Sequence, residues 1–204
     1  MRIVLFPGVA IDDNSKTYEN FLTKIRLKCD CEASVHIWEK DHEHLFTNLP
    51  CKKLRGFVCE VIMDFQQVAI HALDMKVPEA DLYIGHSAGS ILALAQKKPC
   101  IVFGSPANLV ELINTKKGKN LKIKDTLNAI MGDDIYPVLN IVNEYDIIAY
   151  PLYRGNVTNY KYKAFKYSPF SYFPLTMHSN YWKSAKVMNK IIETIGEWKK
   201  KNIV

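Results

Sequence analysis

The chain has 204 residues, which is enough for about one domain with a substantial buried core. Hydrophobic residues make up 48% and charged residues 24%, with 9 Gly and 9 Pro, and this composition excludes disordered and collagen-like chains. The net charge of +6 permits an acidic partner without requiring one, so no nucleic acid partner is expected. Charged residues interrupt every apolar window before the roughly 18 residues of a membrane span, and none is expected.

The N-terminal sequence MRIVLFPGVAIDD is interpreted as a first strand, because Pro7-Gly8 and two Asp follow its apolar run instead of the small residues of a secretory cleavage site. The chain has five cysteines, an odd number that cannot be paired completely within one molecule. We therefore expect reduced thiols and a cytoplasmic location.

Short apolar runs alternate with apolar residues at helical spacing along the chain. Because strands separated by helices require crossover connections, this order predicts a parallel sheet covered on both faces. We find no internal repeat and no linker, and therefore predict an α/β fold: a single domain, 1–204, forming a three-layer α/β/α sandwich with a mostly parallel sheet. The expected strands are 3–6, 34–38, 81–85, 100–103, 137–142 and 160–165; the expected helices are about 18–25, 54–73, 88–96 and 182–198.

One motif with chemical content lies between a predicted strand and a predicted helix. The sequence Gly85-His86-Ser87-Ala88-Gly89 has the pattern G-x-S-x-G. A strand that turns directly into a helix strains the backbone of its middle residue, and glycine two positions away on either side avoids a collision. The Ser87 hydroxyl is thereby exposed at the sheet edge, which predicts a nucleophile. His86 is expected to be structural, because its side chain points away from that of Ser87.

A serine nucleophile requires a base and an acid that orients the base. His178 is the one histidine after Ser87 and lies in a loop before the last helix, so it is the candidate base. Asp146 is the candidate acid, because it directly follows a buried-strand pattern that ends at the same sheet edge. Glu144 follows the same strand and remains the alternative acid.

With Ser87, Asp146 and His178 in this order, the chain resembles a small α/β-hydrolase over nearly its whole length. The segments Asn-Glu-Tyr-Asp-Ile-Ile and His-Ser-Asn-Tyr-Trp are also similar to the acid and histidine loops of class 3-type lipases. The resemblance implies an oxyanion hole formed by the amides of Val9 and Ala88. Pro7 precedes Gly8 where the family commonly has His, which leaves open which amide of this loop points inward.

Other features carry weaker functional interpretations. Aromatic residues are frequent over 150–173, where they form either a substrate-binding wall or ordinary packing. The lysines between Lys116 and Lys124 form either a solvated loop or a patch that contacts phosphate or lipid headgroups, so peripheral membrane contact is possible. The spacing of His42 and His44 and of Cys29 and Cys31 is not that of a metal or redox motif, and no metal or cofactor is expected.

These observations predict a cofactor-free serine hydrolase that cleaves carboxylic esters, with small molecules or lipids as substrates. Thioesterase, acyltransferase and peptidase activities are alternatives, because the same triad serves all of them. A non-catalytic binding protein with a hydrolase fold is the alternative outside enzymes. Acyl chain length and oligomeric state are left open by the sequence.

Overall fold

A computed structural model gives the fold of the chain, and it describes residues 1–8, 15–38, 65, 67–110, 125, 128–130, 136–153, 156–164, 178 and 180–204. The strands are β1 (Arg2–Phe6), β2 (Glu32–Val35), β3 (Leu82–His86), β4 (Cys100–Phe103), β5 (Val138–Asn143) and β6 (Val157–Tyr162). The helices are α1 (Ser15–Cys29), α3 (Ala88–Ala95), the 3-10 helix η3 (Asn180–Lys183) and α7 (Ala185–Lys200).

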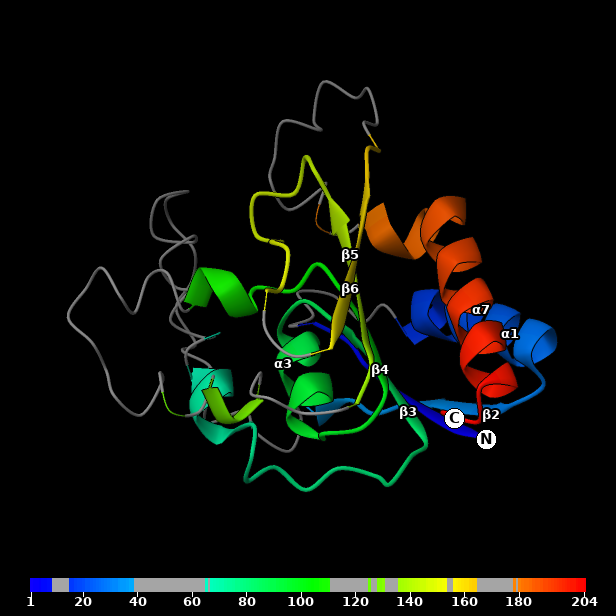
Figure 1. The fold of residues 1–204 in the computed structure, drawn as a ribbon, viewed down its shortest axis with the longest axis horizontal. Helices are drawn as coiled ribbons and strands as arrows, with labels where there is room; N and C mark the ends of the chain where they lie inside the picture. The colour runs from blue at the N-terminus through cyan, green and yellow to red at the C-terminus, as the bar shows by residue number, and fades with distance from the viewer. Residues whose placement is uncertain are drawn as a thin grey trace.

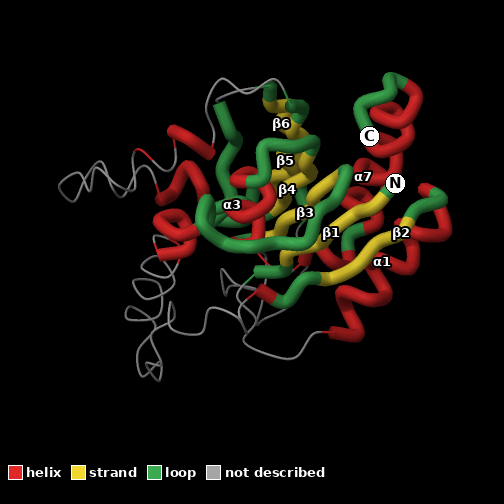
Figure 2. The backbone as a smooth tube through the Cα atoms, turned by 90° about the horizontal axis from the view of Figure 1, so that it is seen from below, coloured by secondary structure: helices red, strands yellow, loops and turns green. Residues whose placement is uncertain are grey.

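The six strands form one parallel sheet in the order β2-β1-β3-β4-β5-β6, which can be followed in Figure 2. From β1 the chain passes to β2 on one side, and β3 then pairs with the other side of β1. The direction of the strand order therefore reverses between β1 and β3. In open parallel sheets, such a reversal opens a crevice at the carboxyl ends of the strands, where ligands bind.

Helices cover both faces of this sheet. Figure 1 shows α3 on one face and α1 with α7 on the other. Successive side chains of β1 point to opposite faces: Val4 and Phe6 join the core beneath α3, whereas Ile3 and Leu5 join the core beneath α1 and α7. Burial on both faces accounts for the continuous apolar runs that predicted the strands.

The predicted α/β class and parallel sheet are thus confirmed, with two strands displaced from their expected positions. The strand expected over 34–38 is Glu32–Val35, because its pairing with β1 begins at Arg2 and ends at Leu5. The strand expected over 160–165 is Val157–Tyr162, because it pairs with β5 from that strand's first residue. Most of the helix expected over 54–73 lies outside the described residues. No helix in the described ranges is both long and apolar enough to cross a membrane.

Candidate active site

The segments after β1 and β3 meet at the point where the strand order reverses. A β-carbon added to Gly8 would lie 2.6 Å from the Ser87 Cβ and 3.2 Å from the Ser87 Oγ. Only glycine therefore allows the chain leaving β1 to pass this close to Ser87. In the sequence, the signal for this close approach of Gly8 is the Pro-Gly turn after the first strand.

Ser87 lies in the sharp turn between β3 and α3 and has a strained backbone. Its φ of 52° and ψ of −128° are values that residues with a β-carbon rarely adopt. A β-carbon on Gly85 would lie 2.5 Å from the Ser90 Cα, and one on Gly89 would lie 2.3 Å from the carbonyl oxygens of Phe6 and Pro7. Neither position accommodates a side chain, so the two glycines allow the turn to form.

Hydrogen bonds fix the backbone of Ser87 without using its hydroxyl as a helix cap. The Ser87 amide donates to the Phe103 carbonyl oxygen at 3.1 Å, and the Ser90 hydroxyl donates to the Ser87 carbonyl oxygen at 2.6 Å. The Ser87 side chain makes no capping hydrogen bond to α3, although serine often has this role. Ala88 follows as the first residue of α3 and is fully buried. Its amide is among the N–H groups that a helix leaves without an intrahelical partner.

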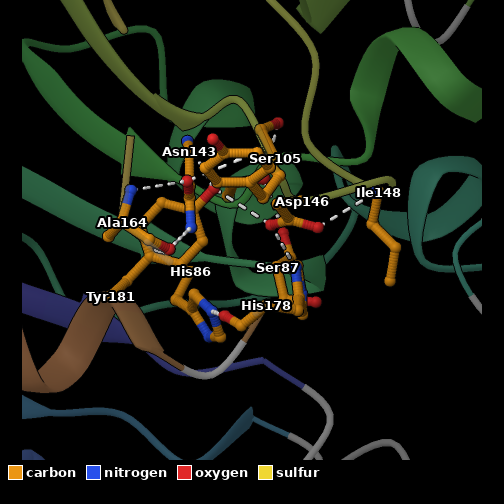
Figure 3. Close-up of polar contacts among 11 residues, drawn as sticks. His86, Ser87, Ser105, Asn143, Asp146, Ile148, Ala164, His178 and Tyr181 are labelled. Atoms are coloured by element: carbon orange, nitrogen blue, oxygen red, sulfur yellow. Dashed lines mark hydrogen bonds and ion pairs between the residues drawn. The ribbon is translucent and has the colours of Figure 1, made fainter. Parts of the chain in front are cut away.

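His178 and Asp146 form a buried pair at the same edge of the sheet (Figure 3). The His178 Nδ1 lies 2.8 Å from the Asp146 Oδ2. Burial of the carboxyl group tends to raise the pKa of Asp146, but hydrogen bonds from His178, the Ile148 amide and Tyr181 hold that pKa below its usual value. Asp146 is therefore ionised at neutral pH, and the His178 Nδ1 is the donor of the pair.

This pairing leaves the second ring nitrogen of His178 available. The His178 Nε2 is buried and has no hydrogen-bond partner in the described part of the chain. His178 packs against Gly104, which directly follows the Phe103 that binds the Ser87 amide. No hydrogen bond therefore joins this nitrogen to the Ser87 hydroxyl within the described residues. An imidazole nitrogen without a proton can accept one from a serine hydroxyl that comes within hydrogen-bonding distance.

His86, the residue before Ser87, contacts the backbone of His178. The His86 Nε2 lies 3.0 Å from the His178 carbonyl oxygen, and its ring packs against Phe103 and Trp182. Burial, together with the neighbouring His178, lowers the pKa of His86 to about 3, so the ring is neutral at pH 7. Because a carbonyl oxygen can only accept, the neutral ring carries its proton on Nε2 and donates there.

Both candidates for the triad acid lie in residues 144–148, here called the acid loop, and the structure distinguishes between them. Asp146 contacts His178, whereas the Glu144 carboxylate lies 3.2 Å from Lys163 Nζ and its side chain is 39% exposed. Sequence reasoning did not identify Gly104 or Tyr181 as site residues. Gly104 has a φ of 63°, and a β-carbon there would lie 3.0 Å from the His178 ring. The only sign of this role in the sequence is that a glycine directly follows a strand. Nothing in the sequence around Tyr181 marks its contact with Asp146.

Several predicted features fall wholly or partly outside the described residues. Among the described aromatic residues of 150–173, Tyr162 is buried, whereas Tyr150 and Tyr153 are exposed. Cys29, Cys31 and Cys100, the three described cysteines, are free. Outside the described ranges lie the proposed oxyanion residue Val9, His42 and His44, the lysines from Lys116 to Lys124, and the aromatic residues over 165–173.

Comparison with known proteins gives no family for this chain. No protein-family model matches the sequence, and no curated protein matches it.

Proposed function

We propose that the chain is a serine hydrolase of the α/β-hydrolase type that cleaves carboxylic esters through Ser87, His178 and Asp146. The observation that carries this proposal is the state of His178. Its Nδ1 is held by the buried Asp146 carboxylate, and among the described residues its buried Nε2 has no partner, at the sheet edge where Ser87 is held in a strained turn. A solely structural histidine in such a place would be expected to use both ring nitrogens.

Each residue has a defined role in the proposed reaction. The His178 Nε2 takes the hydroxyl proton as the Ser87 Oγ attacks the ester carbonyl carbon, and Asp146 stabilises the imidazolium that forms. The Ala88 amide, and Val9 as the resemblance implies, donate to the oxyanion, each contributing about 3 kcal/mol. His178 then protonates the leaving alcohol. Water, activated by the same nitrogen, cleaves the acyl-enzyme and regenerates Ser87.

A substrate series tests this proposal. We expect the wild-type protein to hydrolyse short p-nitrophenyl esters, and Ser87→Ala to reduce kcat/KM by at least about 10³-fold. Ser34→Ala is the matched control, because Ser34 is an exposed serine on β2, away from the site, and its replacement should leave turnover unchanged.

Thioester and peptide substrates in the same series test the alternative activities, and an added alcohol acceptor tests acyl transfer. Turnover of none of these substrates by a folded wild-type protein, or equal turnover by Ser87→Ala, would overturn the proposal. A binding protein with a hydrolase fold would then be the better description.

A further inference from the structure

Asp146 binds a second side chain besides that of His178. The Tyr181 hydroxyl lies 2.9 Å from the Asp146 Oδ2, the oxygen that also binds His178, and the Ile148 amide donates to Oδ1 at 3.0 Å. Both carboxylate oxygens therefore accept hydrogen bonds. His178 and Tyr181 are three residues apart in the chain, so one segment supplies both side-chain donors (Figure 3).

The direction of the Tyr181 hydroxyl proton follows from its second contact. The Asn143 backbone amide lies 3.0 Å from the same hydroxyl oxygen, and an amide can only donate. The hydroxyl therefore accepts from Asn143 and gives its one proton to Asp146. Burial, followed by the Asp146 charge, raises the pKa of Tyr181 well above its usual range, so this proton is retained.

Packing fixes the position of the Tyr181 ring. The residue is fully buried, and its ring centroid lies 5.7 Å from that of Phe103, 5.9 Å from that of Tyr162 and 5.9 Å from that of His86. Because Asn143 ends β5, the hydrogen bond from its amide ties this ring to the strand that precedes the acid loop.

We propose that Tyr181 is a positioning residue, which orients the Asp146 carboxylate for His178 and shares its negative charge. This proposal rests on the proposed function for its catalytic consequence. The hydroxyl proton draws charge from the oxygen that also faces the imidazole. Without the Tyr181 hydroxyl, the Asp146 carboxylate is less well oriented, and its full negative charge interacts with the His178 imidazolium. Among the described residues, the titratable groups around Asp146 are His178, His86, Tyr162 and Tyr181 itself.

Tyr181→Phe tests the proposal, because it keeps the buried ring and removes only the hydroxyl. We expect kcat to fall about tenfold, the size expected for one hydrogen bond to a charged group, with little change in KM. The acidic limb of the kcat/KM profile should move to higher pH by about 0.5 pH unit, corresponding to a roughly threefold change in protonation. Tyr162→Phe is the matched control, because the buried Tyr162 hydroxyl makes no hydrogen bond to Asp146 within the described residues.

A readout independent of turnover separates failure of this proposal from failure of the proposed function. The NMR titration midpoint of the His178 ring protons should rise in Tyr181→Phe and stay in place in Tyr162→Phe, even if no substrate is found. In the wild-type protein, the Tyr181 hydroxyl proton should exchange slowly with solvent and show a nuclear Overhauser effect to the His178 Nδ1 proton. An unchanged midpoint in a folded Tyr181→Phe protein would overturn the positioning role. If Tyr181→Phe does not fold, rapid solvent exchange of the Tyr181 hydroxyl proton in the wild-type protein would overturn the positioning role.

Discussion

The backbone of Ser87 is strained by about 1–3 kcal/mol, the typical cost of such a conformation for a residue with a β-carbon. The hydrogen bonds of its amide to Phe103 and of its carbonyl oxygen to Ser90 hold the residue there. Strain of this kind persists where the surroundings impose it, and it concentrates at functional sites. At the scale of single residues, the Ser87 turn and the Asp146–His178 pair are the two features that favour nucleophilic catalysis.

Asp146→Asn tests the assignment of the acid. The uncharged amide cannot stabilise an imidazolium as the carboxylate does, and its NH2 group can donate to the His178 Nδ1 and so favour the wrong tautomer. We therefore expect kcat for ester hydrolysis to fall by about 10⁴-fold. Glu144→Gln removes the alternative acid, whose exposed ion pair with Lys163 contributes little, and should change kcat less than about twofold. Steady-state kinetics of both variants makes the comparison. A larger loss in Glu144→Gln than in Asp146→Asn would reverse the assignment.

At the scale of elements, the turn from β3 into α3 depends on close backbone contacts. Gly85→Ala would place a β-carbon 2.5 Å from the Ser90 Cα, and a backbone atom cannot move aside as a flexible side chain can. We expect the free energy of unfolding to fall by about 2 kcal/mol or more. Gly196→Ala in α7 is the matched control: apart from its own helical turn, no atom of the described residues lies within 4 Å of the added carbon, so this variant should gain about 0.5–1 kcal/mol of stability. Urea denaturation of both variants provides the measurement, and equal stability of Gly85→Ala and wild type would contradict the tight turn.

The helices and strands differ in how well the sequence alone predicts them. Apolar runs located β1, β3, β4 and β5 to within about a residue, because burial on both faces leaves a strong local pattern. The positions of β2 and β6 were less accurate, since these edge strands are partly exposed and their register depends on pairing with a neighbour. The residues Ser87, His178 and Asp146 were selected from motif and chain order. The contacts of Tyr181 and Gly104 depend on how the ends of separate strands meet. A local sequence pattern does not predict this arrangement.

At the scale of the whole molecule, the buried His86 couples stability to pH. Its pKa is about 3 in the folded protein and about 6.5 when exposed, so between these values the unfolded chain binds one more proton than the folded protein. The contribution of His86 to the free energy of unfolding is therefore fully present above pH 6.5 and falls on acidification by at most about 1.4 kcal/mol per pH unit. Asp146, whose pKa is lowered, adds stability that is lost only as pH falls below about 4.

His86→Gln should flatten this dependence between pH 6.5 and pH 4.5, because the amide retains a donor for the His178 carbonyl oxygen but does not titrate in this range. Urea denaturation at several pH values measures the slope. His71→Gln serves as the control, since His71 is partly exposed and lies outside the site, and it should keep the wild-type slope. An unchanged slope in His86→Gln would show that His86 is not the group responsible.

Covalent labelling with a fluorophosphonate tests whether Ser87 is an activated nucleophile, on which the proposed function depends. We expect the intact mass of the wild-type protein to increase by one phosphonyl group, peptide mapping to locate that group on Ser87, and labelling to be absent in Ser87→Ala. A folded wild-type protein that remains unlabelled, or that is labelled at another residue, would contradict the nucleophilic role of Ser87.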